Sequence, residues 1–354
     1  MEKLNRDNEL IEIAKQFEAK NNIKFGEKIG GGGYGIVLNI KTYKDLVAKL
    51  IKKEKNDEVS HIFDIIGPNI TKIVKICDTN REEKEQYHLI IMEKANLKDL
   101  YTIRKEADNK LFNFIINSPF EGLLPDNLIR YYCYEIIKGL ETLDRTGYSH
   151  FDIKPENILI FNYLKIKLSD FSFLKSQDKK NIENGLFEIP GGTKGYISPE
   201  FYENRNVPVD VSKKQDCFAL GSTIYYLKYG RNMLDHPIYD DGDKISDCIM
   251  ELLQRAMDNI KSKKSSDQDF IDFLCSLISY KPNDRPIFEE IYRNKWLNKN
   301  IDKIKEIYNS NFTIEGKLII ELYKSDYLMH KKKELKKVRK KFSFNNNKYK
   351  KILI

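Results

Sequence analysis

Residues 150–157 read His-Phe-Asp-Ile-Lys-Pro-Glu-Asn and place a carboxylate, an ammonium group and an amide at fixed offsets. Pro155 has no N–H donor and fixes φ, so the stretch is predicted to be a loop rather than a helix interior. Asp152 could accept a hydroxyl proton, Lys154 could neutralise developing negative charge, and Asn157 could hold a metal ion through oxygen. The spacing suggests catalysis, and its meaning depends on the motifs around it.

A glycine-rich run lies near the N-terminus, where residues 29–37 read Ile-Gly-Gly-Gly-Gly-Tyr-Gly-Ile-Val. Gly30, Gly32 and Gly35 form a G-x-G-x-x-G pattern, which lets backbone without Cβ atoms approach phosphate groups. The β-prone residues on both sides predict a strand, a turn and a second strand. A dinucleotide-binding turn would need a helix directly afterwards, whereas residues 36–40 continue as a strand, which argues against that type of site.

A single lysine, Lys49, interrupts the next apolar run. Taken alone, such a lysine is most often the solvated edge of a strand. Glu58 is its candidate ion-pair partner, because it shares one stripe of a predicted helix with Ile62 and Ile65. Glu54 is the second candidate for this role.

Further motifs follow the first stretch. Asp170 lies thirteen residues after Asn157, and residues 192–200 read Gly-Thr-Lys-Gly-Tyr-Ile-Ser-Pro-Glu. In chain order these motifs resemble those of the eukaryotic protein kinase family over residues 23–298. The other motifs that carry the resemblance are Asp-Phe-Ser at 170–172, Ser-Pro-Glu at 198–200, Asp216, Arg285 and Lys-Trp-Leu at 295–297.

The resemblance implies an α+β, bilobal protein-kinase fold. Its small N-lobe would be β-rich and carry an αC helix, and its larger C-lobe would be mainly helical. The implied organisation is an N-terminal amphipathic helix at 1–22, a kinase domain at 23–298 (N-lobe 23–92, hinge 93–96, C-lobe 97–298), a helical extension at 299–330 and a basic tail at 331–354.

The resemblance also implies ATP and Mg²⁺, with Mn²⁺ as an alternative, and assigns residues to them. The implied catalytic residues are Asp152, Lys154, Lys49 and Glu58, and the implied metal ligands are Asn157 and Asp170. The implied nucleotide-binding residues are Ile29, Gly30, Gly31, Gly32, Gly33, Tyr34, Gly35, Val37, Val47, Lys49, Glu93, Ala95, Asp99 and Leu159.

The activity implied is transfer of the γ-phosphoryl group of ATP to protein hydroxyls. Lys154 and Thr193 resemble the residues at these positions in serine/threonine kinases. One alternative is a weak or inactive kinase-fold scaffold that acts through its terminal extensions, although no required charged residue is lost. Another is a kinase-like phosphotransferase for small molecules, which would be expected to lack the motifs at 192–193 and 198–200.

Two departures from the family pattern bear on regulation. Phe151 stands where many relatives have an arginine that binds a phosphorylated activation loop, and residues 177–192 contain no Ser, Thr or Tyr. Together they predict activity without activation-loop phosphorylation, with Ser172, Ser176 and Thr193 the only nearby acceptors. Ser172 also replaces the glycine of the metal motif.

The composition is that of a globular protein, with 354 residues of which 41% are hydrophobic and 32% charged. No signal peptide or transmembrane run is evident, and five scattered cysteines predict a reducing, cytoplasmic or nuclear location rather than secretion. Although the net charge is +8, residues 331–354 hold eleven Lys and Arg against one Glu, so the remainder is slightly acidic. This tail is either solvated or a contact for anionic partners, such as nucleic acid, a membrane surface or an import receptor, or an inhibitory segment.

Two segments extend the expected domain. Residues 7–20 have helical periodicity and are interpreted as a helix that packs on the following domain, with partner binding as the alternative. Relative to the family pattern, residues 105–124 are an insertion. They are interpreted as a locally packed surface elaboration, with a docking site for partner proteins as the alternative.

Overall fold

The computed structural model describes residues 2–32, 35–53, 59–79, 86–107, 124, 126–161, 165–177, 182–183, 186–188, 190–204, 206–234, 245–262, 267–302 and 305. The chain forms two compact units, residues 1–95 and 96–354. The boundary falls inside the stretch 93–96 that the resemblance assigns to the hinge. The basic tail, most of the insertion and most of the helical extension lie outside the described residues, so the expectations for them stay predictions.

The first unit is built on a five-stranded antiparallel sheet. Its strands are β1 (Phe25–Gly32), β2 (Gly35–Ile40), β3 (Leu46–Lys52), β4 (Ile73–Asp78) and β5 (Tyr87–Glu93), in the order β1-β2-β3-β5-β4. β1 and β2 pair as far as Gly32 and Gly35, so the two predicted strands are confirmed. The predicted turn, residues 33–34, lies outside the described residues. A Cβ atom on Gly35 would lie 2.0 Å from the carbonyl oxygen of Leu50. This close approach of β2 to β3 explains why the position is a glycine.

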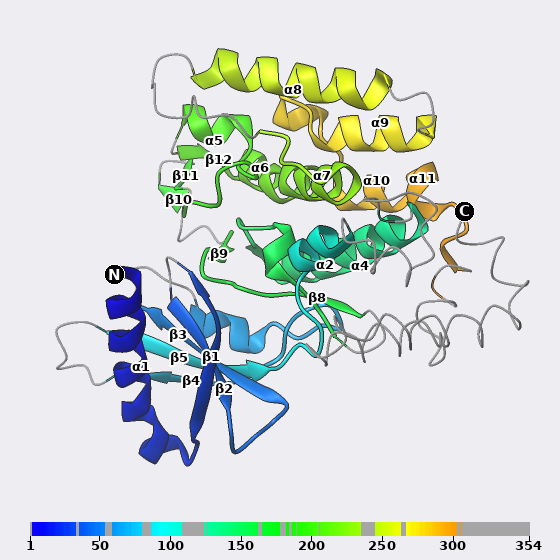
Figure 1. Cartoon of the computed structure of the whole chain (residues 1–354). Coiled ribbons are helices and arrows are strands. Elements are labelled where there is room, and N and C mark those ends of the chain that lie inside the picture. Colours follow the sequence, from blue (N-terminus) through cyan, green and yellow to red (C-terminus); the bar gives the residue numbers. More distant parts are fainter. Residues whose placement is uncertain are drawn as a thin grey trace, which may run out of the picture. The chain divides into compact units, whose positions relative to one another are not determined.

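Helix α1 (Glu2–Asn21) packs on this sheet and is longer than the helix predicted over residues 7–20 (Figure 1). Its residues Leu10, Ala14 and Phe17 are buried in one cluster with apolar side chains of β1, β2, β3 and β5. The Glu18 carboxylate accepts a 2.6 Å hydrogen bond from the backbone N–H of Phe25, which fixes the turn into β1. The interpretation of this segment as a helix that packs on the domain is therefore confirmed.

The predicted αC helix differs from the expectation in its described part. Residues Val59–Asp64 form the 3₁₀ helix η1 instead of an α-helix. Ile62 and Ile65 are buried as the predicted stripe required, but Glu58 and Glu54 lie outside the described residues. Pro68 follows closely and disfavours a helical backbone at Gly67, so a helix in this place has to end before it.

The second unit is mainly helical (Figure 1). Its described helices are α2 (Leu100–Ala107), α4 (Asp126–Arg145), α5 (Pro199–Glu203), α6 (Val209–Ser212), α7 (Lys214–Tyr229), α8 (Ile245–Ser262), α9 (Gln268–Leu277), α10 (Phe288–Tyr292) and α11 (Lys295–Asn298). Short strands pair around them: β6 (Tyr148–Ser149) with β9 (Lys175–Ser176), β7 (Ile158–Ile160) with β8 (Ile166–Leu168), and β10 (Ile182–Glu183) with β11 (Leu186–Glu188) and β12 (Asn206–Pro208).

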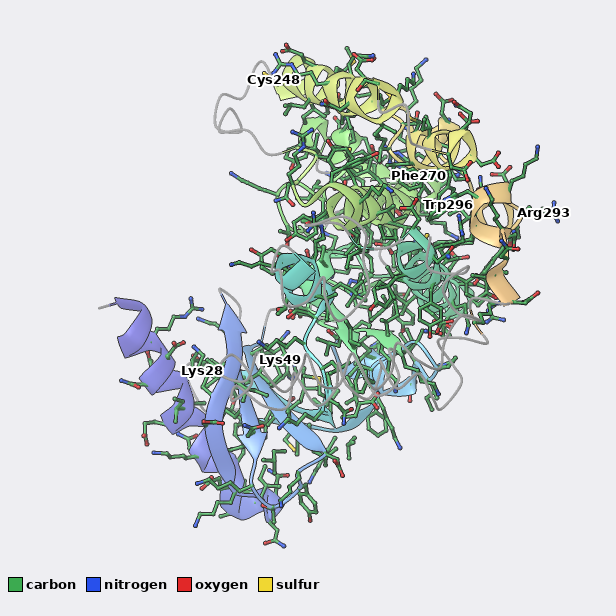
Figure 2. All side chains as sticks on the ribbon, turned by 45° about the vertical axis from the view of Figure 1, so that its right-hand side comes forward. Lys28, Lys49, Cys248, Phe270, Arg293 and Trp296 are labelled. Atoms are coloured by element: carbon green, nitrogen blue, oxygen red, sulfur yellow. The ribbon has the colours of Figure 1, made fainter. Side chains whose placement is uncertain are left out.

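The core of this unit centres on α4 and α7, which contact each other and are largely buried. Trp296 closes one end, with its ring 5.0 Å from that of Phe270 and 5.3 Å from that of Phe273 (Figure 2). The Arg130 guanidinium lies 4.9 Å from the Trp296 ring, in a cation–π contact that fastens α11 to α4. None of the helices in the described part of the chain is both long and apolar enough for a membrane span.

Gly230 ends α7 in the left-handed conformation, with φ 71°. A Cβ atom there would lie 2.2 Å from Nη2 of the buried Arg104 side chain. Gly147, after α4, has φ 79° but no heavy atom within 4 Å of the same position. The two glycines therefore share a backbone constraint and differ in their surroundings.

We predict that Gly147→Ala costs about 1 kcal/mol of unfolding free energy for its backbone alone. Gly230→Ala should cost about 1 kcal/mol more than Gly147→Ala, because the end of the buried Arg104 side chain has to move as well. Urea unfolding of both variants beside the wild type measures the difference. Equal losses in the two variants would contradict the packing role assigned to Gly230.

Candidate active site

The loop of residues 150–157, called the catalytic loop below, is held in place by the buried carboxylate of Asp216. Asp216, in the first turn of α7, accepts hydrogen bonds from the backbone N–H of His150 at 2.7 Å and of Phe151 at 3.0 Å. Burial raises the pKa of Asp216, while His150 and the two N–H donors act in the opposite direction. Phe151 adopts φ 62°, which is unusual for a non-glycine residue, so these bonds stabilise a bend that the chain would otherwise resist.

The side chain of Asp152 is fixed at both of its oxygens. Oδ1 accepts a 2.6 Å hydrogen bond from the Thr193 hydroxyl. Oδ2 accepts from Lys154 Nζ and from the Asn157 amide, both at 2.8 Å. Lys154 also donates to the Thr193 hydroxyl at 2.5 Å. The structure thus brings together Asp152, Lys154 and Asn157 as predicted, with Asp152 only 3% exposed.

Asp170 also adopts a left-handed backbone conformation, with φ 57°, and its Oδ1 accepts a 2.7 Å hydrogen bond from the Ser172 hydroxyl. The next side chain, Phe171, packs on His150 with ring centroids 5.2 Å apart. His150 Nε2 donates to the carbonyl of Ser169 at 3.0 Å, which ties the stretch before Asp170 to the catalytic loop. Ser172 is therefore more than a tolerated replacement for glycine, because its hydroxyl orients the neighbouring carboxylate.

The residues predicted to hold a metal suit a hard cation. The Asn157 amide nitrogen donates to both the carbonyl and the carboxylate of Asp152, which orients the amide and leaves its oxygen as the candidate ligand. Asp170 supplies a half-buried carboxylate. Amide and carboxylate oxygens are the donors that Mg²⁺ prefers, so the donor set fits the predicted ion.

The segment after Thr193 is anchored to α7 and to the loop before α10. The Gln215 side chain accepts from the Ser198 backbone N–H at 2.8 Å and donates to the carbonyl of Tyr196 at 3.0 Å. Glu200 and Arg285 form a bidentate ion pair at 2.7 and 2.8 Å, and Arg285 is 1% exposed. A buried bidentate pair is costly to break, so this segment has a fixed position.

In the first unit, Lys49 lies on β3 between Val37 of β2 and Ile90 of β5 (Figure 2). Its neighbours Ala48 and Leu50 point into the cluster under α1, so Lys49 faces the opposite side of the sheet. That alternation argues against a mere strand edge, because β3 is an internal strand.

The described nucleotide-binding candidates of this unit lie on the same sheet, except for Ala95, which follows β5. Gly30, Gly31, Gly32 and Gly35 lie in the paired ends of β1 and β2, Ile29 is 46% exposed, Val47 is buried, and Glu93 and Ala95 are half-buried. Gly33 and Tyr34 lie outside the described residues.

The predicted nucleotide-binding residues of the second unit lie side by side, since Asp99 and Leu159 form an isolated β-bridge. Asp99 has a structural task that the sequence did not indicate. Its Oδ1 accepts a 2.7 Å hydrogen bond from the backbone N–H of Thr102, which caps the start of α2. A role in ribose binding would therefore share this carboxylate with the cap.

The fold and the geometry of this site can be compared with known proteins. A family model described as "Protein kinase domain" matches residues 23–297, more than half of the chain. The chain belongs to the protein kinase family. The kinase motifs named above thus lie on a kinase fold.

Several curated relatives of this kinase carry serine/threonine kinase names. Serine/threonine-protein kinase dst2 of Dictyostelium discoideum is 30% identical over 182 residues, 51% of this chain and 15% of the relative. An Aurora kinase of Saccharomyces cerevisiae is 25% identical over 294 residues, 79% of this chain and 70% of the relative. CBL-interacting serine/threonine-protein kinase 18 of Arabidopsis thaliana is 25% identical over 291 residues, 80% of this chain and half of the relative. The kinase described here therefore matches only part of the length of each.

Three contacts in this site were not predicted from the sequence: the bonds of Gln215 to the backbone of Tyr196 and Ser198, the bond of Ser172 to Asp170, and the aromatic side chains that contact Phe151. Gln215 is adjacent to the recognised Asp216, and Ser172 is part of a recognised motif, so local signals existed for both. Phe187 and Phe201, which stack on Phe151, carried no signal because they lie far away along the chain.

We predict that Asp216→Ala destabilises this kinase by about 2 kcal/mol or more, because two buried N–H groups lose their acceptor. The stability of Asp216→Asn should lie between those of wild type and Asp216→Ala, since one oxygen acceptor remains. Thermal unfolding and the rate of peptide phosphorylation would be measured together. If Asp216→Ala keeps both at wild-type values, the carboxylate does not hold the loop.

Proposed function

We propose that this protein is a serine/threonine protein kinase that transfers the γ-phosphoryl group of Mg²⁺-bound ATP to protein hydroxyls. The observation that carries the proposal is the cluster of Asp152, Lys154, Thr193 and Asn157, held together by hydrogen bonds of 2.5–2.8 Å. Phosphoryl transfer needs alignment and cancellation of charge more than covalent help, and this cluster offers both.

Each residue of the cluster has a separate task in the proposed reaction. Asp152 orients the substrate hydroxyl and accepts its proton, and its two oxygens are already held in one orientation. Lys154 carries the positive charge that offsets charge on the transferred group. Asn157 and Asp170 would hold Mg²⁺, which when bound supplies further positive charge to the phosphates. Lys49 would bind the α- and β-phosphates.

The choice of serine and threonine rests on Lys154 and Thr193. Lys154 lies two residues after Asp152, and its ammonium group contacts both Asp152 and Thr193. The curated relatives named as serine/threonine kinases support the same choice. The scaffold alternative is less well supported, because Lys49, Asp152 and Asp170 are all present.

We predict that Asp152→Asn lowers the rate of peptide phosphorylation by about 10²-fold or more, because Asn cannot accept the proton. Turnover of ATP on a peptide library would be compared for wild type, Asp152→Asn and the control Asp272→Asn, which changes an exposed carboxylate on α9. The Asp272→Asn control should keep wild-type turnover. Addition of EDTA should abolish turnover in wild type, because EDTA removes Mg²⁺. Equal turnover in wild type and Asp152→Asn would refute the mechanism.

We further propose that activity does not require phosphorylation of the activation segment, the stretch between Asp170 and Ser198. Residues 177–192 contain no hydroxyl side chain. The three nearby acceptors are engaged or buried: Ser172 bonds Asp170, Thr193 bonds Asp152, and Ser176 is 6% exposed. Phe151 has no charge with which to bind a phosphate.

We predict that phosphatase treatment leaves the rate of peptide phosphorylation unchanged. Mass spectrometry would verify that Ser172, Ser176 and Thr193 carry no phosphate, and mock-treated protein serves as the control. Loss of activity after treatment, with recovery on rephosphorylation, would show that a phosphate switch exists after all.

A further inference from the structure

Phe151 is the centre of an aromatic stack in the second unit. Its ring is 1% exposed, and it lies parallel to that of Phe187, with centroids 5.4 Å apart and planes 11° apart. The ring of Phe201 stacks on it as well, at 6.1 Å and 26°. The left-handed backbone of Phe151, fixed by Asp216, is the conformation in which its side chain meets these two partners.

Each partner of Phe151 is anchored on its own element. Phe187 lies in the middle of β11, where its backbone pairs with Ile182 of β10 and Val207 of β12. Phe201 lies in α5, directly after Glu200, whose carboxylate is fixed by Arg285. The aromatic stack therefore joins three separate parts of the chain: the catalytic loop, the activation segment and α5.

A second contact brings the activation segment onto the same residue. A Cβ atom on Gly192 would lie 3.0 Å from the carbonyl oxygen of Phe151, so the two backbones approach closely. The next residue, Thr193, donates its hydrogen bond to Asp152. The activation segment thus rests on Phe151 twice, through the ring of Phe187 and through the backbone of Gly192.

We propose that Phe187 and Phe201 are positioning residues for phosphoryl transfer, whose stack on Phe151 holds the activation segment where Thr193 meets Asp152. The proposal rests on the kinase function proposed above and explains how the segment is ordered without phosphate. A buried cation at position 151 would need a phosphate to offset its charge, whereas aromatic rings stabilise one another in the unmodified chain. The contact is present as soon as the chain folds.

The variant that tests the proposal is Phe187→Ala, and its matched control is Leu186→Ala on the same strand. Leu186 is 41% exposed and lies on the opposite face of β11, so the control removes an apolar side chain without touching the stack. We expect Phe187→Ala to lower kcat for a peptide substrate by about tenfold or more, because a displacement of about 1 Å among catalytic groups can cost about 10²-fold in rate. The KM for ATP should stay unchanged, and Leu186→Ala should behave as wild type.

Partial rescue distinguishes positioning by the ring from general loss of stability. Phe187→Leu keeps apolar volume and should recover part of the lost kcat. The double variant Phe151→Leu/Phe187→Leu should lower kcat by less than the product of the two single reductions, because each single variant already removes the same contact. A multiplicative effect, or equal losses in Phe187→Ala and Leu186→Ala, would overturn the proposal.

Limited trypsin digestion gives a readout that does not depend on turnover. Lys194 is exposed and directly follows Thr193, so release of the segment should speed cleavage there in Phe187→Ala but not in Leu186→Ala. If Phe187→Ala fails to unfold cooperatively, Phe201→Leu replaces it with the same expectations. If wild type shows no turnover but trypsin cleaves Phe187→Ala faster than wild type, the kinase function is contradicted and the contact of Phe187 with the segment is not. Unchanged cleavage and unchanged kcat would refute the positioning role.

Discussion

The two hydrogen bonds that Asp216 accepts from His150 and Phe151 are the constraint on which the second unit depends. They hold the catalytic loop in a left-handed bend, and that bend sends the Phe151 ring toward the activation segment. Asp152, directly afterwards, faces Thr193 and Asn157. A single carboxylate at the start of α7 therefore sets both the polar cluster and the aromatic stack, which lie on neighbouring residues of one loop.

The polar cluster and the aromatic stack have different parts in the proposed reaction. Lys154 and Asp152 bond each other and Thr193, so these groups would exchange partners when a substrate binds. The rings of the stack would keep their contacts during the proposed reaction. One short loop would then combine a fixed contact with the activation segment and polar groups that are able to rearrange.

Local patterns in the sequence predicted much of this arrangement, and long-range contacts supplied the rest. The two paired strands β1 and β2 followed from β-prone residues, and the motif at 150–157 placed Asp152, Lys154 and Asn157 together. The partners of Phe151 could not be predicted in this way, because Phe187 lies on a three-residue strand whose pairing with β12 is set only in the folded chain. The cap that Asp99 provides for α2 was missed for a different reason, since Asp99 was assigned only to nucleotide binding and its local role as a helix cap was not considered. The 3₁₀ turn at Val59–Asp64 shows that an apolar stripe fixes which residues are buried and not the type of helix that buries them.

Helix α1 also changes what should be regarded as the folding unit of this protein. The family match begins at residue 23, after α1 has ended, yet Leu10, Ala14 and Phe17 complete the apolar cluster on one face of the sheet. A chain cut at the family boundary would present that face of β1, β2, β3 and β5 to water, and such a surface promotes self-association. The stretch that the family model matches is thus shorter than the stretch that completes the apolar cluster of the first unit. A domain boundary that is placed where the family match begins would separate α1 from the apolar cluster to which it belongs.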